Sequence, residues 1–382
     1  MRQSVNAVVL AAGKSKRFRG QPSKLITQIC GQEMILYPLK TLSKLGFETT
    51  VVVGNLASEL SSLISKHNLK NINFAYQKEP LGTGHAVACT RPLWEKDNVL
   101  VINGDMPLVT SDMLEELVNK HHKTNATVSL ITTFVATPSG YGRIIEDSNG
   151  VRIVEEKDCD ESERRVGRIN AGVYLFSKKF LTEKIDSIQS NNASGEFYLT
   201  DLVKMANDSG LKVNLISRSY DEVRGVNTLE ELWAAEQITR SEIMKDLMDR
   251  GVRFELAQTI HVDIGVEIGD GSFIGNGALL LGNTKVGKNS KVLACSIVKN
   301  STVGNETTIH AHSVVEDCKV GDRCVISPFT HLHGNSTLED DIKVGSFVEI
   351  CDGKTVPSGS HVTKEASGDK KDAAVKAHQV SA

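Results

Sequence analysis

The sequence lacks long apolar runs, paired cysteines and an excess of basic residues. No segment approaches the roughly 20 consecutive apolar residues of a membrane span, and the apolar run near the N-terminus is too short for the core of a signal peptide. The seven cysteines are dispersed without a Cys-x-x-Cys pair, which favours reduced thiols over disulfides or a zinc site. The net charge of -3 does not favour nucleic acid as a partner. Together these absences predict a cytoplasmic protein whose partners include neither a membrane nor a nucleic acid.

What is present is a chain long enough for two domains. Its 382 residues are 40% apolar and 24% charged, proportions typical of a globular protein. In residues 1–228, short apolar segments such as VNAVVLAAG and NVLVINGD alternate with helical ones such as ASELSSLISKH. This alternation predicts a Rossmann-like α/β domain with a mostly parallel sheet. Such sheets bind ligands at the carboxyl ends of their strands, where Gly13 and Asp105 are expected.

The pattern changes after residue 228. Residues 229–250 form a continuous charged helical segment, which we interpret as a connector. Beyond it, aliphatic residues recur every six positions from Val262 to Val292 and, after an irregular stretch, from Val320 to Val362. A glycine that would permit a corner often follows. This period predicts a left-handed β-helix of hexapeptide repeats over residues 251–363, with five to six coils. It also predicts a homotrimer, because such solenoids commonly pack around a threefold axis. The polar residues 364–382 predict a disordered tail.

The segment LAAGKSKRFRGQPSKL (10–25) is the first candidate binding motif. A strand that enters a turn of glycine and alanine can present backbone N–H groups to an anion. Arg17 and Lys24 would add charge suited to a triphosphate. The alternative is a tight turn with solvated basic residues. The segment contains neither the P-loop nor the dinucleotide-binding pattern.

Further candidates lie at the ends of regular segments. Asp105 follows a buried strand, where a carboxylate can bind magnesium together with substrate phosphates, although an exposed turn aspartate would fit the same pattern. Asn227 precedes the connector helix, a position that also suits an N-cap. In QKEPLGTGHAV (77–87), Gly82 and Gly84 would let the backbone approach a flat ligand.

Taken together, these segments resemble the bacterial bifunctional N-acetylglucosamine-1-phosphate uridylyltransferase/glucosamine-1-phosphate acetyltransferase family. The resemblance runs from residue 5 to about residue 350. LAAG alone is shared by many sugar and alcohol nucleotidyltransferases, whereas its combination with GTGHA, GDMPL, YGRI, EEKD, NAG and GEFYLTD is far narrower. The resemblance implies transfer of a uridylyl group from UTP to N-acetylglucosamine 1-phosphate, with Mg²⁺ as the cofactor.

The resemblance also implies a role for each matching residue. It assigns the nucleotide cradle and its charge to Leu10, Ala11, Ala12, Gly13, Arg17 and Lys24, and the uracil contacts to Gln77, Gly82 and Thr83. It assigns the magnesium ion to Asp105 and Asn227. It assigns the sugar phosphate to Gly142, Glu155, Asn170, Tyr198 and Thr200. Ser15 and Lys16 stand where the family has Gly-Thr, so the selectivity for the nucleotide stays open.

The family's second activity, acetylation of glucosamine 1-phosphate, is not expected here. That site needs an arginine and lysines on the middle coils and a catalytic histidine on later ones. His331 and His333 stand in the position of the arginine-bearing loop, and Cys351 and Asp352 replace the lysines. The sequence ends about where the catalytic histidine region begins. The solenoid would then serve trimerisation, and whether any acetyl-CoA binding remains is open.

Three other histidines are interpreted as structural, and two other functions stay open. His310, His312 and His361 fit ordinary corners of the repeat better than metal ligands or a catalytic base. One alternative function is nucleotidyl transfer to another sugar 1-phosphate, and the choice between gluco and galacto sugars is not fixed. The other is a non-catalytic assembly subunit of the same architecture. The combination of Lys24, Asp105 and Asn227 favours chemistry over assembly.

Overall fold

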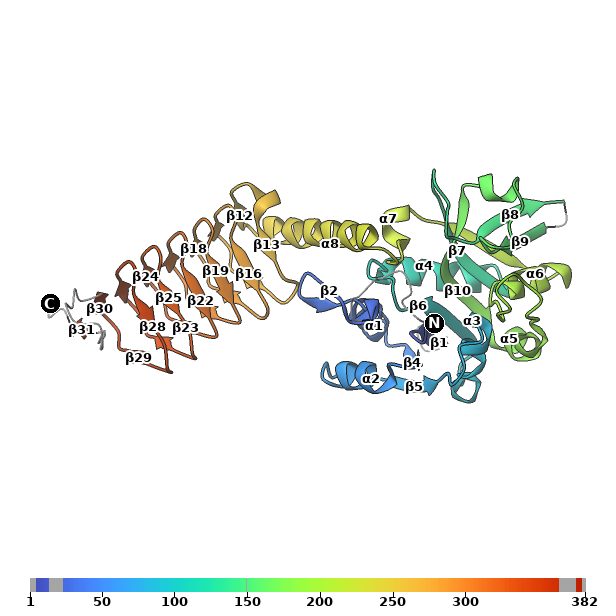
Figure 1. Ribbon diagram of the computed structural model, residues 1–382, viewed down its shortest axis with the longest axis horizontal. Coiled ribbons are helices and arrows are strands. Elements are labelled where there is room, and N and C mark those ends of the chain that lie inside the picture. Colours follow the sequence, from blue (N-terminus) through green and yellow to red (C-terminus); the bar gives the residue numbers. More distant parts are fainter. Residues whose placement is uncertain (1–4, 14–22, 149, 364–375, 380–382) are drawn as a thin grey trace. The chain divides into compact units, whose positions relative to one another are not determined.

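The computed structural model describes residues 5–13, 23–148, 150–363 and 376–379 (Figure 1). Arg17, with Ser15 and Lys16, lies outside these residues. The chain divides into two compact units, one of residues 1–29 and 33–235 and one of residues 30–32 and 236–382. None of the helices in the described parts is long and apolar enough to cross a lipid bilayer.

The first unit is built on a nine-stranded, mostly parallel sheet. Along its main path the order is β11-β7-β10-β6-β1-β4-β5. Strand β10 runs antiparallel to β6 and β7, and the hairpin β8–β9 extends from it. The strands are β1 (Val5–Leu10), β4 (Glu48–Val53), β5 (Ile72–Tyr76), β6 (Asn98–Asn103), β7 (Val128–Phe134), β8 (Arg143–Asp147), β9 (Gly150–Val154), β10 (Arg168–Ser177) and β11 (Val213–Ser217). The α/β domain expected from the alternating sequence is therefore confirmed.

Helices follow most of these strands. The α-helices are α1 (Leu36–Lys44), α2 (Ala57–Ser65), α3 (Thr83–Ala88), α4 (Ser111–Lys123), α5 (Lys178–Lys184), α6 (Asp201–Asp208) and α7 (Tyr220–Val223). Short 3-10 turns lie at Lys24–Ile26, Arg91–Leu93, Glu163–Arg165 and Ile185–Ser187, and β2 (Gln28–Ile29) pairs with β3 (Gln32–Glu33). Helix α4 is capped by the Thr110 hydroxyl, which accepts from the Met113 amide at 3.3 Å.

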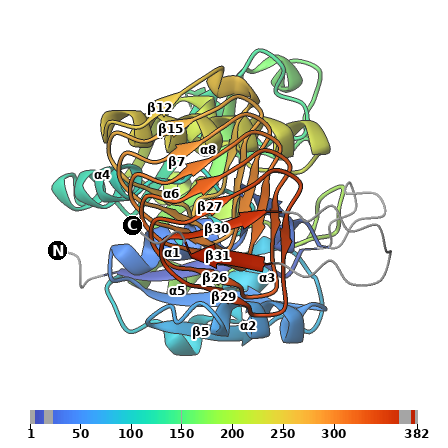
Figure 2. The same cartoon turned by 90° about the vertical axis from the view of Figure 1, so that its left-hand side faces the viewer.

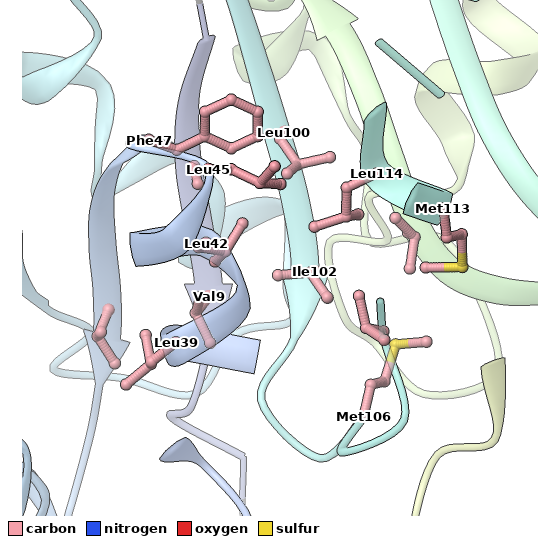
Figure 3. Packing of buried hydrophobic residues seen from close by; sticks show 14 of the residues in the cluster. Val9, Leu39, Leu42, Leu45, Phe47, Leu100, Ile102, Met106, Met113 and Leu114 are labelled. Carbon is pink, nitrogen blue, oxygen red and sulfur yellow. The ribbon is translucent and has the colours of Figure 1, made fainter. Parts of the chain in front are cut away.

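Helices pack onto both faces of the sheet, with α1 and α4 in one buried cluster and α3, α5 and α6 in the other. In Figure 3, Leu39 and Leu42 of α1 lie against Val9 of β1, and Leu114 of α4 lies near Ile102 of β6. All five side chains are fully buried. Burying a leucine or isoleucine contributes about 1.5–3 kcal/mol, so this layer fixes the edge at which β1 and β6 end.

Helix α8 (Leu229–Asp249) and a β-helix follow. Each coil contributes one short strand to each of three parallel sheets, so the expected solenoid is confirmed (Figures 1 and 2). The first sheet contains β12 (Arg253–Phe254), β15 (Phe273–Ile274), β18 (Lys291–Val292), β21 (Thr308–Ile309), β24 (Val325–Ile326), β27 (Lys343–Val344) and β30 (Ser360–Thr363), with β31 (Lys376–Gln379) antiparallel to β30.

The other two sheets have six strands each. One contains β13 (His261–Val262), β16 (Leu279–Leu281), β19 (Ile297–Lys299), β22 (Val314–Glu316), β25 (His331–Leu332) and β28 (Glu349–Ile350). The other contains β14 (Glu267–Ile268), β17 (Lys285–Val286), β20 (Thr302–Val303), β23 (Lys319–Val320), β26 (Thr337–Leu338) and β29 (Thr355–Val356). A 3-10 turn at Ala257–Thr259 precedes β13.

The stretch that breaks the six-residue period is not irregular. Val298, Val303, Ile309 and Val315 are all buried and continue the inward row of the solenoid. The steps from Val298 to Val303 and from Val315 to Val320 have five residues instead of six. The period was lost because two corners are one residue shorter, while the three sheets continue through them.

The glycines that follow the inward aliphatic residues allow neighbouring coils to approach closely, and they do not adopt the left-handed conformation of the corners. A Cβ on Gly287, for example, would lie 2.5 Å from the carbonyl carbon of Gly304 on the next coil, and the φ of Gly287 is not positive. The left-handed corner positions are instead occupied by residues such as Asn289, His312 and Phe329, with φ of 54°, 60° and 61°. The expectation that these glycines permit the corners was therefore wrong, because other residues occupy the left-handed corner positions.

Candidate active site

The loops after β1, β4, β5 and β6 meet at one edge of the sheet. The Gly104 amide donates to the Leu10 carbonyl at 3.0 Å, and the Gln77 amide donates to the Val53 carbonyl at 2.9 Å. A cavity of about 470 Å³ lies at this edge, a size that suits a small ligand. Its lining residues are Leu10, Ala11, Ala12, Gly13, Lys24, Leu25, Gln77, Pro80, Gly82, Thr83, Ala86, Asn103, Asp105 and Glu196. We call it the nucleotide-side cavity.

One end of this cavity is formed by a glycine whose backbone no other residue would adopt easily. Gly82 has a φ of 119°, and a Cβ there would lie 2.6 Å from the Phe197 carbonyl oxygen. The Gln77 side-chain nitrogen donates to the Gly82 carbonyl at 3.0 Å and lies 3.1 Å from His85 Nδ1. The amide group of Gln77 is therefore held in one orientation, which turns its oxygen away from these partners.

Lys24, Asp105 and Asn227 form a charged cluster, of which Lys24 and Asp105 line this cavity. Lys24 Nζ donates to Asp105 Oδ2 and, at 2.9 Å, to Asn227 Oδ1. The side chains of Lys24 and Asp105 are 17% and 15% exposed. The Val226 amide donates to the Asp105 carbonyl at 2.9 Å, which draws residues 225–227 to the end of β6. One cation thus lies between a carboxylate oxygen and an amide oxygen from distant segments.

Asn227 is not the N-cap of α8. The helix begins at Leu229, and the Glu231 amide donates to the Thr228 hydroxyl at 3.1 Å. The Glu231 carboxylate in turn accepts from the amides of Asn227 and Thr228 at 2.7 and 2.9 Å. This reciprocal pattern resembles a capping box, with Thr228 as the cap. The side chain of Asn227 is therefore available to the cluster at Asp105.

A second cavity of about 230 Å³ adjoins the first. Leu10, Thr83, Asn103 and Asp105 line both. Its other lining residues are Met106, Gly140, Tyr141, Gly142, Glu155, Asn170, Ala171, Gly172, Tyr174, Leu199, Thr200, Gly225 and Asn227. We call it the sugar-side cavity, and Asp105 lies where the two meet.

Glu155 is the buried acid of the sugar-side cavity. Burial raises the pKa of its carboxyl, although the Thr200 hydroxyl donates to it at 3.0 Å and partly opposes the rise. A Cβ on Gly142 would lie 3.4 Å from both Glu155 oxygens, so the glycine leaves room beside the carboxylate. The Asn170 amide donates to the Gly142 carbonyl at 2.9 Å. This group can accept hydrogen bonds from hydroxyls and donate through the Asn170 side chain.

A bulge and an ion pair made by a buried arginine support this wall. The register between β7 and β10 shifts between Asn170 and Tyr174, which aims Asn170 at the site. Arg143, 1% exposed, pairs with Glu156 at 2.6 Å and donates to the Tyr141 carbonyl. Arg143 belongs to the segment YGRII and Glu156 to the segment IVEEKD. These two motifs therefore also contain the ion pair that stabilises the loop around Gly142.

The structure brings together most residues that the sequence singled out. Lys24, Asp105, Asn227 and eleven of the twelve substrate-binding candidates line the two cavities. Tyr198 is described but is not among the lining residues, although its neighbour Leu199 is. Arg17 lies outside the described residues. Sequence reasoning missed Asn103 and Glu196, which stand within the motifs NGD and GEFYLTD and could have been included with them.

Comparison with known proteins covers both units. The Nucleotidyl transferase family matches residues 6–241, and the GMPPB C-terminal domain matches residues 257–369. The chain is similar to the Bifunctional protein GlmU of Clostridioides difficile (strain 630), with 36% identity over 348 residues, or 90% of this chain and 75% of that protein. It is also similar to the protein of that name from Clostridium novyi (strain NT), with 35% identity over 363 residues, or 94% of this chain and 78% of that one.

Proposed function

Because the chain belongs to the nucleotidyl transferase family, we propose that it transfers a uridylyl group from UTP to N-acetylglucosamine 1-phosphate, giving UDP-N-acetylglucosamine and pyrophosphate. The observation that carries the proposal is the pair of adjoining cavities with Asp105 between them. A nucleotide in one and a sugar phosphate in the other would bring their phosphates together beside Lys24.

The nucleotide-side cavity supports a uracil base. The Gln77 amide nitrogen already bonds to Gly82 and approaches His85, so its oxygen remains as the acceptor for a ligand. Uracil presents an N–H donor at the position where cytosine presents an acceptor, so a fixed acceptor favours uracil. The Ala11 amide already donates to the Val52 carbonyl at 2.9 Å, so the backbone N–H groups that the turn would offer to the triphosphate are those of Ala12 and Gly13.

The sugar-side cavity supports a hydroxyl-rich ligand with an amide group. The carboxylate of Glu155 can accept from sugar hydroxyls, and Asn170 and Thr200 add neutral donors and acceptors beside it. A site with buried polar groups rejects a ligand that leaves them without partners. These residues would therefore recognise the acetamido group of the sugar through hydrogen bonds.

The chemistry needs positioning and charge rather than a general base. The sugar phosphate is already ionised, and its oxygen attacks the α-phosphorus of UTP in line while the bond to pyrophosphate breaks. Lys24, and Arg17 by resemblance, would offset the charge on the phosphoryl oxygens. Holding the two phosphates at reacting distance would supply much of the rate enhancement.

Mg²⁺ fits the residues present. The carboxylate of Asp105 and the amide oxygen of Asn227 are hard oxygen donors, and they already converge on one cation, the Lys24 ammonium. We infer that these two residues would hold the ion. When bound, it would supply positive charge beside the reacting phosphates.

A separate observation supports a second candidate, a reaction with another sugar phosphate or nucleotide. The match of residues 257–369 to the GMPPB C-terminal domain supports a different sugar phosphate or nucleotide. The same two cavities would serve such a reaction, because the phosphates would meet at the same place.

The test is pyrophosphate release across UTP, dTTP, CTP, ATP and GTP, each with N-acetylglucosamine, N-acetylgalactosamine, glucose and mannose 1-phosphates. We expect the highest kcat/KM for UTP with N-acetylglucosamine 1-phosphate. A preference of tenfold or more for another pair would replace the proposed substrates. If no pair released pyrophosphate, the chain would be the non-catalytic assembly subunit.

A further inference from the structure

The outer face of one solenoid sheet carries a cluster of histidine and carboxylate groups. Strand side chains alternate between faces, so Leu332 is buried in the core while His331 and His333 point outward. On the next coil, Glu349 is in register with His331. The repeat of the solenoid therefore places two imidazoles and a carboxylate side by side, about one strand spacing apart.

The ligand atoms of His331, His333 and Glu349 are close enough together to bind one metal ion. His333 Nε2 lies 3.0 Å from Glu349 Oε1, and His331 Nδ1 lies 3.9 Å from the same oxygen. The three ligand atoms all lie within 4.8 Å of one another. Ligands about 2.0–2.1 Å from a tetrahedral metal lie about 3.3 Å apart, so small side-chain rotations would bring all three into coordination.

We propose that His331, His333 and Glu349 bind a divalent transition-metal ion, with zinc as the best match. Two imidazole nitrogens and one carboxylate oxygen form a ligand set that zinc accepts, whereas magnesium and calcium prefer oxygen alone. The dispersed cysteines predicted that the chain has no zinc site, because that reasoning considered cysteine pairs and not these two histidines. Three protein ligands on an outward face leave the fourth position to water.

A neighbouring carboxylate completes the arrangement. His331 Nε2 is buried and makes no hydrogen bond to the described residues, and the nearest carboxylate oxygen across from it is Glu316 Oε2 at 3.9 Å. A histidine that binds metal through one nitrogen usually donates through the other to a carboxylate, which fixes its tautomer. With Nδ1 facing Glu349 and Nε2 facing Glu316, His331 has both halves of that pattern.

The surrounding charge suits a cation. Glu316 and Glu349 bring two negative charges, and Lys299, 3.8 Å from Glu316, offsets one of them from the far side. The two imidazole rings stack with centroids 4.3 Å apart.

The experiment is a calorimetric titration of the full chain with ZnCl₂. Excess Mg²⁺ is included so that the oxygen site at Asp105 does not take zinc. We expect one zinc ion per chain at this site, and at least about 100-fold weaker binding in His333→Ala and in Glu349→Gln. Glu316→Gln should weaken binding about 10- to 100-fold, because it removes only the partner of a ligand.

The matched control is His310→Ala, which removes a solenoid histidine outside the cluster and should leave zinc binding unchanged. X-ray absorption of the zinc-loaded chain should show two imidazoles and light-atom neighbours without sulfur. The proposal is overturned if the wild-type chain binds no zinc at micromolar concentration. It is also overturned if His333→Ala and Glu349→Gln bind it like the wild type, or if His310→Ala weakens binding as much as they do. The result does not depend on the nucleotidyl transfer proposed above.

Discussion

At the scale of single residues, the Lys24 ammonium connects the two oxygen donors of the site. It donates to Asp105 and Asn227, whose segments are far apart in the sequence. Under the proposed function, Mg²⁺ would bind the same two oxygens and would therefore compete with Lys24 for them. Lys24 would then be released towards the phosphates, where its charge is needed.

The first prediction concerns this pair of oxygen donors. Asp105→Asn and Asn227→Ala should each lower turnover by about 100-fold or more, because each removes a charge-stabilising contact at the reacting phosphates. The measurement is pyrophosphate release at saturating Mg²⁺. Asp112→Asn, an exposed carboxylate in the first turn of α4, is the control and should keep full turnover. Wild-type rates in either site variant would refute the metal assignment.

The second prediction concerns Gly82. Gly82→Ala should raise the KM for UTP at least tenfold, because the new Cβ would lie 2.6 Å from the Phe197 carbonyl and displace the wall of the nucleotide-side cavity. Gly46→Ala is the control, since Gly46 also has a positive φ, 73°, but a Cβ there meets nothing within 4 Å. It should cost about 1–2 kcal/mol of stability and leave KM unchanged. Equal KM values for the two variants would argue against the contact.

The location of a residue could be predicted where it follows the end of a strand. Asp105 and Gly13 could be expected at the same edge of the sheet because parallel strands end together there, and both line the nucleotide-side cavity. The position of Tyr198 could not, because GEFYLTD is a loop held by tertiary bonds such as Phe197 N to Leu81 O at 2.8 Å. The support that Glu231 gives to Asn227 was missed as well, since the helix start had to be fixed before its cap could be identified.

At the scale of elements, α4 shows how one buried polar residue can set a pH limit. His121 of α4 is 2% exposed and lies 2.9 Å from the Ser129 hydroxyl of β7. Burial, and secondarily the nearby His122, lowers the pKa of His121 to about 4. The folded chain therefore keeps this imidazole neutral at pH values where the unfolded chain protonates it.

The third prediction follows from that difference. A lowered histidine pKa means that stability is fully present above about pH 6.5 and is lost as pH falls towards 4. The loss at His121 should reach about 3 kcal/mol, at about 1.4 kcal/mol for each pKa unit. Urea unfolding of His121→Gln between pH 7 and 4.5 should show a smaller loss than the wild type. His67→Gln, an exposed histidine, should follow the wild-type curve, and parallel curves for all three would exclude His121 as the cause.

Elements were predictable where the period was regular. The strands and helices of the first unit and the coils of the solenoid follow from hydrophobic spacing, because burial depends directly on it. The two five-residue corners shift the inward row by one residue, so the six-residue period did not identify Val303, Ile309 and Val315 as buried. The close approach of neighbouring coils at Gly287 depends on their stacking, which spacing within one coil does not reveal.

At the scale of the whole molecule, the two units have separate cores. The clusters of buried residues in the first unit contain none of those in the solenoid, among the residues that the structure describes. Our fourth prediction is that removal of residues 251–382 leaves a folded, monomeric first domain, whereas the full chain is a trimer by light scattering. A full-length monomer at micromolar concentration would contradict the proposed role of the solenoid.

The fifth prediction is that the chain does not acetylate glucosamine 1-phosphate. Phosphate recognition uses bidentate or charge-assisted bonds from arginine and lysine, which neutral histidine and cysteine do not replace. Around His331 and His333 the structure instead places Glu316 and Glu349, whose charge opposes an anionic substrate. The measurement is release of free thiol from acetyl-CoA. Release as fast as uridylyl transfer would show that other residues supply the phosphate site.

Among the described strands of residues 253–363, each coil of the solenoid pairs with the coils directly before and after it. The solenoid therefore behaves as a one-dimensional array of coils, each stabilised by its neighbours. A destabilising substitution in one coil should weaken one or two neighbouring coils and not the whole solenoid. Opening should start at an exposed end and travel inward, so amide protection would form a gradient along the axis. A cavity made in a middle coil would divide this cooperative run into two shorter ones. The solenoid should therefore tolerate substitutions on its outer face, where His331 and His333 lie, as long as the inward row stays complete.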